Sequence, residues 1–196
     1  MKKEKKEHLL EQTVQFLLEE KPFNMENLAT ELGVVRKTLY NHFRSREGLI
    51  EETIEYFFRA NRLKVEEIID QDLPYLMRGD MLLKHLAELI DSTEKFCAHR
   101  EIRDSDVEDM YRQSFDTIRK KISLFVKEGQ LEGWLRSDTP LETMAHMVFS
   151  LVLGSIHNRS ADQSYSSYLT LLMQGLAGDR ARTIERDRSP LPDLVT

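Results

Sequence analysis

Residues 33–49 read GVVRKTLYNHFRSREGL, and this stretch decides how the rest of the chain is interpreted. It holds seven basic or aromatic side chains, although the whole chain is acidic, with a formal net charge of −6. That acidic balance argues against a protein coated with basic charge. The stretch instead predicts one short basic element that faces a polyanion, at the less acidic end of the chain.

Two short helices meeting at a glycine are the simplest reading of this region. A helix-turn-helix needs a small residue where its helices touch, a glycine in the turn and a bulky apolar residue on the second helix. Ala29, Gly33 and Leu39 lie at the usual spacing for these roles. Asn24 stands where it can cap the first helix, and Phe43 joins Leu39 on the inner face of the second.

The outer face of the second helix is then predicted to carry the DNA contacts. Its N-terminal end is the part that enters a major groove in this motif. Arginine and lysine donate to guanine, asparagine pairs with adenine, and neighbouring groups reach phosphates. The alternative is that the rings only pack and the cations only coat a solvated face. The predicted DNA-binding residues are Asn24, Arg36, Lys37, Thr38, Tyr40, Asn41, His42, Arg44 and Arg46.

Residues 25–57, MENLATELGVVRKTLYNHFRSREGLIEETIEYF, resemble the DNA-binding domain of TetR-family transcriptional regulators. The resemblance rests on the glycine turn, the TLYNHF helix and the residues Arg46, Glu47 and Leu49 after it. Val35 departs from the family, which often has serine there, so the second helix lacks the expected cap. Arg46 stands where the family favours lysine. The resemblance implies an all-helical homodimer of about nine helices per subunit, whose DNA is released when a ligand binds the C-terminal domain.

The whole chain is predicted to be all-α, because apolar residues recur at spacings of three and four along nearly all of it. A break is expected at Pro74 and Gly79, with the next helix starting at Met81. Thr139 and Pro140 give a strong helix start. The predicted domains are a helix-turn-helix DNA-binding domain at 1–46 with its motif at 24–43, a ligand-sensing and dimerisation domain at 47–178, and a mobile tail at 179–196.

Two C-terminal helices are predicted to build the dimer. The helix at 140–157 is apolar almost all round, and together with residues 165–177 it carries more apolar surface than one small subunit easily hides. A central core helix in a monomer is the alternative. A two-fold dimer would bind a palindromic operator with half-sites about one helical turn apart. The predicted interface residues are Met144, Met147, Val148, Leu151, Val152, Tyr168, Leu172 and Met173.

A small-molecule effector is predicted to bind between residues 60 and 135. The basic candidates suggest an anionic or polar-headed ligand, and the aromatic and methionine candidates suggest an apolar body. The alternatives are ordinary core for the apolar residues and plain surface for the charged ones, so the class of ligand stays open. The predicted ligand-binding residues are Phe58, Arg62, Met81, Phe96, His99, Tyr111, Phe115 and Trp134.

Other classes of protein find little support in the sequence. A single cysteine, Cys97, allows no internal disulfide and no cysteine cluster for a metal. Glu142 and His146 lie four residues apart, but a third metal ligand is missing nearby. We therefore expect no metal, no cofactor and no enzyme activity. The N-terminus lacks a signal peptide and no stretch could span a membrane, so a cytoplasmic protein is expected. An architectural DNA-binding protein without a ligand is the rival reading.

Overall fold

The regular elements in the described part of the chain are all helices. The computed structural model describes residues 2–19, 21–99, 108–157 and 175–181. Within these ranges the only β-type contact is an isolated antiparallel bridge between Leu135 and Ala177. The helices are α1 (Lys2–Leu18), α2 (Met25–Glu31), α3 (Arg36–Phe43), α4 (Arg46–Ile69), α5 (Tyr75–Ala98), α7 (Glu108–Leu131) and α8 (Leu141–His157). The predicted all-α class is confirmed. The count of about nine helices and the tail involve residues outside the described ranges and stay predictions.

The chain forms two compact units. The first comprises residues 1–68 and 88–118, and the second comprises residues 69–87 and 119–196. Helices α5 and α7 therefore supply residues to both units. The predicted domain boundary at residue 46 coincides with the start of α4 and lies inside the first unit. The division into units therefore does not test this boundary, which stays a prediction.

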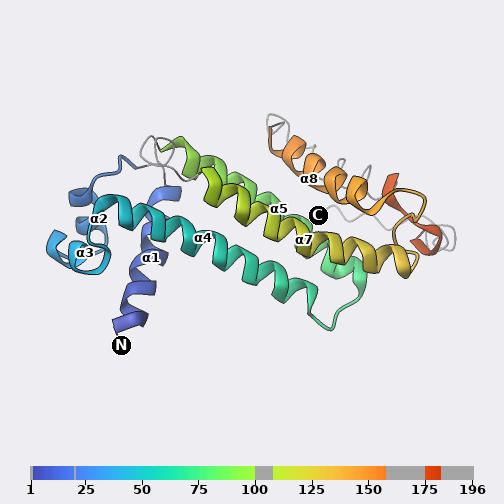
Figure 1. Cartoon of the computed structure of the whole chain (residues 1–196), viewed down its shortest axis with the longest axis horizontal. Helices are drawn as coiled ribbons and strands as arrows, with labels where there is room; N and C mark the ends of the chain where they lie inside the picture. The colour runs from blue at the N-terminus through green and yellow to red at the C-terminus, as the bar shows by residue number, and fades with distance from the viewer. Residues whose placement is uncertain (1, 20, 100–107, 158–174, 182–196) are drawn as a thin grey trace, which may run out of the picture. The chain divides into compact units, whose positions relative to one another are not determined.

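Helices α1 to α3 and the start of α4 gather around a small apolar core in the first unit (Figure 1). Leu28, Leu39 and Leu49 come from α2, α3 and α4, and each is 0% exposed. Full burial of one leucine contributes about 1.5–3 kcal/mol. These three side chains therefore fix the angle at which α3 leaves the bundle.

Aromatic pairs extend this core along α4. The Phe57 ring stacks on that of Phe96 with centroids 4.9 Å apart, and the Phe58 ring meets that of Phe115 edge-on at 5.4 Å. Such pairs contribute about 0.5–1.5 kcal/mol beyond their buried area. They join α4 to the parts of α5 and α7 that belong to the same unit.

Arg78 holds the second unit together. Its side chain is 12% exposed and forms an ion pair with Glu128. It also donates to the carbonyl oxygens of Ile69 (2.7 Å) and Leu73 (3.1 Å), and so satisfies the last carbonyl of α4. The hydrogen bond that the guanidinium donates to Glu128 raises the pKa of Arg78. One cation thus links a helix end, a connection and α7.

Helix α5 begins earlier than the sequence pattern suggests. A start at Met81 was expected, but α5 begins at Tyr75 and runs through Gly79, so the expected break at that glycine is wrong. Glycine weakens a helix by about 1 kcal/mol. Here packing outweighs this cost, since Leu82, Leu83 and Leu86 of the same helix are buried. Pro74 alone marks the break.

The apolar helix α8 begins where the start signal predicts. It starts at Leu141, and the Met144 amide donates to the Pro140 carbonyl oxygen over 3.0 Å. Among the helices of the described ranges, α8 included, none combines the length and the apolar character needed to cross a bilayer.

Candidate nucleic-acid interface

Helix α3 has one buried and one exposed face. Leu39 and Phe43 are 0% and 2% exposed, which confirms their predicted inward orientation. The exposed side chains span two turns and belong to Val35 (the residue before the helix), Arg36, Lys37, Tyr40 and Asn41. The helix therefore presents cations, an aromatic ring and an amide together to solvent.

Local hydrogen bonds set the position of this face. The Asn24 side chain accepts from the amides of Glu26 (3.0 Å) and Asn27 (2.8 Å), so the predicted cap of α2 is confirmed. Gly33 adopts φ +61°, a left-handed conformation that favours glycine, and so turns the chain between α2 and α3. The Val34 amide then donates to the Ala29 carbonyl oxygen over 2.9 Å.

The C-terminal end of α3 is held by a second turn. Arg44 has φ +63°, an uncommon conformation for a residue with a side chain. The next residue, Ser45, accepts a hydrogen bond from the Gly48 amide over 2.9 Å and so caps α4. A Cβ at Gly48 would approach the Phe43 carbonyl oxygen to 2.6 Å, so the tight passage from α3 to α4 requires glycine.

The cations of this region differ in their surroundings. Within the described part of the chain, Lys37 and Arg44 are exposed and enter no ion pair. The Arg36 guanidinium lies 5.9 Å from the centre of the Tyr40 ring. By contrast, Lys6 pairs with Glu52 over 2.5 Å. Lys37 and Arg44 therefore leave positive charge available to an anion on α3 and just after it.

Three further predicted DNA-binding side chains are half-buried. They belong to Thr38, His42 and Arg46. The His42 ring lies 6.1 Å from that of Phe43, and the Arg46 guanidinium lies 5.3 Å from the Phe23 ring. These residues edge the exposed face and also pack against the bundle.

Two of the predicted ligand-binding residues lie in the core of the first unit. Phe96 is 0% exposed and stacks on Phe57. His99 is 9% exposed, and its Nε2 lies 2.7 Å from the carbonyl oxygen of Leu17, in the last turn of α1. The histidine, directly after α5, therefore joins that helix to the end of α1 through a contact between residues 82 apart, which helical spacing does not predict.

A polar groove in the first unit contains two more of them. It has a volume of about 390 Å³ and is lined by Glu55, Phe58, Arg59, Arg62, Gln113, Ser114 and Thr117. Arg62 lies 3.7 Å from Glu66, and Arg59 lies 3.3 Å from Glu7. Both arginines thus already have carboxylate neighbours. Phe115 packs against Phe58 beside this groove.

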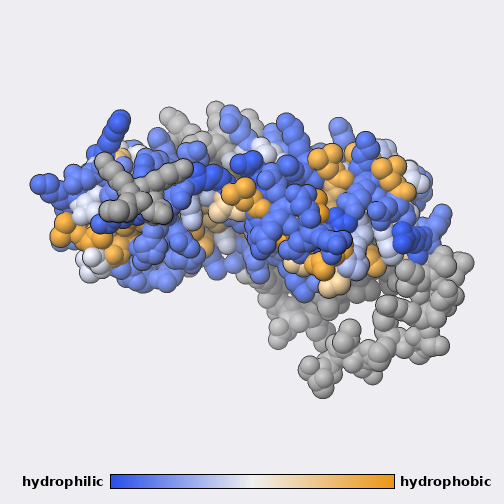
Figure 2. Space-filling view, turned by 90° about the horizontal axis from the view of Figure 1, so that it is seen from below, coloured by the Kyte–Doolittle hydropathy of each residue, from blue (hydrophilic) through white to orange (hydrophobic). Residues whose placement is uncertain are grey.

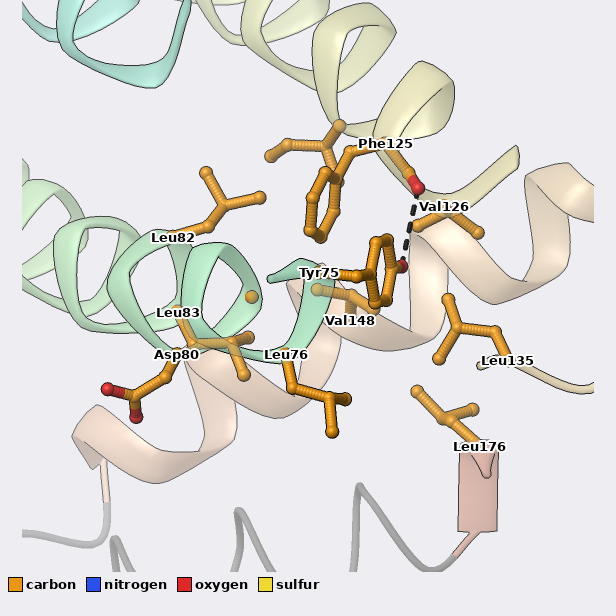
Figure 3. A pocket seen from close by; sticks show the side chains of 12 residues that line it. Tyr75, Leu76, Asp80, Leu82, Leu83, Phe125, Val126, Leu135, Val148 and Leu176 are labelled. Carbon is orange, nitrogen blue, oxygen red and sulfur yellow. Dashed lines mark hydrogen bonds between the residues drawn. The ribbon is translucent and has the colours of Figure 1, made fainter. Parts of the chain in front are cut away.

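A smaller apolar cavity lies in the second unit (Figure 3). It has a volume of about 170 Å³. Figure 3 shows the Tyr75 and Phe125 rings side by side, with centroids 4.4 Å apart and the Tyr75 hydroxyl donating to the Phe125 carbonyl oxygen over 3.3 Å. Burial raises the pKa of this hydroxyl, and Glu128 adds to the rise. The lining residues are Tyr75, Leu76, Gly79, Asp80, Leu82, Leu83, Ile122, Phe125, Val126, Leu135, Val148 and Leu176.

Seven of the eight predicted ligand-binding side chains are described by the structure, and none of these seven lines the apolar cavity. Trp134 lies close to the lining, since the centre of its ring is 6.3 Å from that of the Tyr75 ring. Met81 is half-buried on α5. Tyr111 lies in α7, but its side chain is outside the described residues. The sequence pattern missed this cavity because it placed the start of the helix at Met81. The helix begins at Tyr75, so Tyr75 and Leu76 belong to it and can line the cavity.

The predicted dimer residues fall into three groups. Met144 and Val148 are 0% and 8% exposed, so they pack within their own protomer. Met147 is 42% exposed. The others lie outside the described side chains: they are Leu151 and Val152, whose backbone belongs to α8, and Tyr168, Leu172 and Met173. Among the described residues, no group of three acidic, histidine or cysteine side chains could hold a metal ion.

Comparison with known proteins gives a match in the region of this interface. Residues 17–53 match the model of the family described as "Bacterial regulatory proteins, tetR family". These residues include all of α2 and α3, with the end of α1 and the start of α4. A comparison with curated proteins gives no match.

Solved structures resemble the chain over most of its length. A TetR transcriptional regulator from Streptomyces coelicolor is 22% identical, with a TM-score of 0.67 over 89% of this chain and 99% of that one. Reduced NemR of E. coli is 16% identical, with a TM-score of 0.71 over 88% and 97%. AibR, in complex with isovaleryl coenzyme A and operator DNA, is 12% identical, with a TM-score of 0.61 over 88% and 97%. At these identities the likeness shows a common fold.

Proposed function

The chain belongs to the TetR family of bacterial regulatory proteins through its N-terminal domain, and on that premise we propose that it is a ligand-responsive repressor. It binds a palindromic operator as a homodimer, and a small molecule releases it. The observation that carries the proposal is the division of α3, which buries Leu39 and Phe43 and exposes Arg36, Lys37, Tyr40 and Asn41.

The exposed face of α3 supports binding in a major groove. Lysine and arginine donate to guanine O6 and N7, and asparagine forms two hydrogen bonds with adenine. Lys37 and Asn41 lie four residues apart on the exposed side of the helix, so both reach the same groove. Arg44 and Arg46 supply phosphate contacts, which set affinity and register without reading sequence.

Dimerisation rests on α8 and on the family. TetR regulators act as dimers, and Met147 leaves an apolar side chain exposed on a helix of otherwise apolar character. Because Met144 and Val148 are occupied within the protomer, the proposed interface relies on Met147, Leu151, Val152, Tyr168, Leu172 and Met173.

The apolar cavity is the proposed effector site. A dry cavity of about 150 Å³ lined by leucine, isoleucine and phenylalanine is large enough for one benzene ring. The cavity of about 170 Å³ beside Tyr75 thus suits a monocyclic or short-chain apolar molecule. This choice replaces the anionic or polar-headed ligand suggested by the sequence, because Asp80 alone is charged among the described residues of the lining. Since α5 and α7 also supply residues to the first unit, they are the proposed route from effector to DNA.

Footprinting with matched variants tests the DNA-binding part. Lys37→Ala and Asn41→Ala should lose the preference for the operator. The control is Lys127→Ala, which removes an exposed lysine of α7 in the second unit. It changes the net charge as much as Lys37→Ala does and should keep the preference. Circular dichroism and native mass should stay those of a folded dimer of 23.0 kDa subunits. If Lys37→Ala and Asn41→Ala leave a protected palindrome unchanged, the proposal is wrong.

The alternative function is a DNA-binding architectural or regulatory protein without an effector. It predicts binding to many duplexes with a steep dependence on salt and no preferred palindrome. A screen of small apolar compounds for release from the operator separates the two functions. Leu83→Trp, which fills the apolar cavity, should abolish release by any active compound while operator binding persists.

A further inference from the structure

Val35 is an exposed hydrophobic residue at the start of the recognition helix. Its side chain is 69% exposed. Among the described residues before Leu63, the other large hydrophobic side chain that is exposed is that of Tyr40, at 38%. Figure 2 shows a mostly hydrophilic surface with small hydrophobic groups, one of them in the region of α2 and α3. Val35 and Tyr40 both belong to the exposed face of α3 that is proposed to meet DNA.

Local stability does not account for valine at this position. Val35 occupies the N-cap of α3, with φ −84° and ψ 147°, and makes no side-chain capping bond. Serine, threonine, asparagine or aspartate at an N-cap stabilises a helix more than an apolar residue does, because its side chain accepts a hydrogen bond from a free amide of the first turn. The chain uses that chemistry one helix earlier, at Asn24. Val35 provides no cap, and its exposed side chain gains no burial that would compensate for the missing hydrogen bond.

The backbone around Val35 is nonetheless well anchored. The Val35 carbonyl oxygen accepts from the Thr38 amide over 2.8 Å, and the preceding Val34 amide donates to Ala29 over 2.9 Å. A β-branched side chain also has few rotamers. The two methyl groups of Val35 are therefore held in a defined place, directly before Arg36 and Lys37, and little further ordering is needed on binding.

One chemical group in the major groove matches such a surface. The groove carries hydrogen-bonding groups from every base pair, but its apolar feature is the C5-methyl group of thymine. The N-terminal end of a recognition helix is the part that contacts base edges. A lone exposed valine elsewhere would need no explanation. At this end of this helix its methyl groups lie beside the cations that donate to guanine.

We propose that Val35 selects a T·A base pair in each operator half-site by packing against the thymine methyl group. The inference rests on the proposed DNA-binding function and adds a determinant of sequence preference to it. Arg36 and Lys37 supply polar readout at neighbouring positions, and valine rejects a pyrimidine without the methyl group because it has no hydrogen bond to offer instead. A two-fold dimer makes this contact twice.

Deoxyuridine substitution tests the contact atom by atom. An operator is first selected from random palindromic duplexes with the full chain, and each thymine is then replaced by deoxyuridine, which removes only the methyl group. One symmetric pair of positions should weaken wild-type binding about fourfold per half-site, or on the order of fifteenfold for both, from the transfer free energy of a single methyl group. Val35→Ala should bind both duplexes alike.

Two further variants separate recognition from folding. Val35→Ser restores a cap, so it should raise the free energy of unfolding while it loses the discrimination between thymine and uracil. Val35→Thr keeps one methyl group and should keep part of that discrimination. Lys127→Ala on α7 should discriminate as the wild type does.

The outcomes distinguish this inference from the function beneath it. If a palindrome is selected but uracil at every position leaves wild-type binding unchanged, the role of Val35 is refuted and the DNA-binding function stands. Equal sensitivity to uracil in the wild type and Val35→Ala also refutes it, since another side chain then reads the methyl group. If no duplex is preferred, both proposals fail.

Discussion

Two glycines beside the same aromatic pair should respond in opposite ways to the same substitution. Gly79 in α5 and Gly129 in the last turn of α7 both adjoin the stacked rings of Tyr75 and Phe125. A Cβ at Gly79 would lie 3.8 Å from the Phe125 ring, in ordinary contact. A Cβ at Gly129 would overlap the Tyr75 hydroxyl and lie 3.0 Å from Leu135 Cδ1.

The magnitude follows from these contacts. Alanine in place of glycine within a helix gains about 0.5–1 kcal/mol in either variant. In Gly129→Ala the Tyr75 ring cannot move aside freely, because it is stacked between Phe125 and Trp134. Overpacking then costs about 1–3 kcal/mol, and losing the hydrogen bond from Tyr75 to Phe125 costs about 1 kcal/mol more. The two variants should therefore differ in their free energy of unfolding by about 2–4 kcal/mol.

Urea denaturation at one fixed protein concentration measures this difference, since the stability of a dimer depends on concentration. Gly79→Ala should unfold at the same or higher urea than the wild type, and Gly129→Ala at lower urea with an unchanged slope. If Gly129→Ala is as stable as Gly79→Ala, the packing of Tyr75 against α7 is not as described and the reasoning is refuted.

Three other predictions concern the core, a cap and a buried hydroxyl. Leu39→Ala should cost about 2–5 kcal/mol in urea denaturation, because the side chain is 0% exposed; a loss under 1 kcal/mol would contradict its central place. Asn24→Ala should cost about 1 kcal/mol by removing the cap of α2, whereas Asn24→Ser should be nearly neutral; equal losses would argue against capping. Burial raises the pKa of Tyr75, so the folded chain keeps a proton that the unfolded chain releases near pH 10. The free energy of unfolding should therefore keep this contribution below pH 10 and lose it as the pH rises above 10. In Tyr75→Phe the free energy of unfolding should fall less steeply above pH 10.

Local chemistry made the DNA-binding end readable from the sequence. The cap at Asn24, the turn at Gly33 and the cap at Ser45 each involve partners within three or four residues. The inward orientation of Leu39 and Phe43 follows from helical spacing alone. Such short-range signals depend little on the rest of the fold, and here they agree with it.

The cavity and the internal contacts could not be predicted from the sequence, because they depend on residues far apart in the chain. The hydrogen bond from Tyr75 to Phe125 joins residues 50 apart, and the contact between His99 and Leu17 joins residues 82 apart. Periodicity assigns a residue to a face but does not identify its partner on another helix. His99 was therefore expected in a ligand pocket, although it packs against the end of α1. Met144 was expected at a dimer interface, although it is buried within its own protomer.

The contact between His99 and Leu17 bears on how DNA specificity can be transplanted between regulators. A chimera joined at residue 46 would carry α1 to α3 but would leave the Leu17 carbonyl to whatever side chain the recipient offers in place of His99. An unsatisfied buried carbonyl costs about 1–3 kcal/mol, which is a substantial part of the stability of a small domain. The graft that preserves this contact takes residues 1–68 together with 88–118, so the portable DNA-reading module of this protein is discontinuous in sequence.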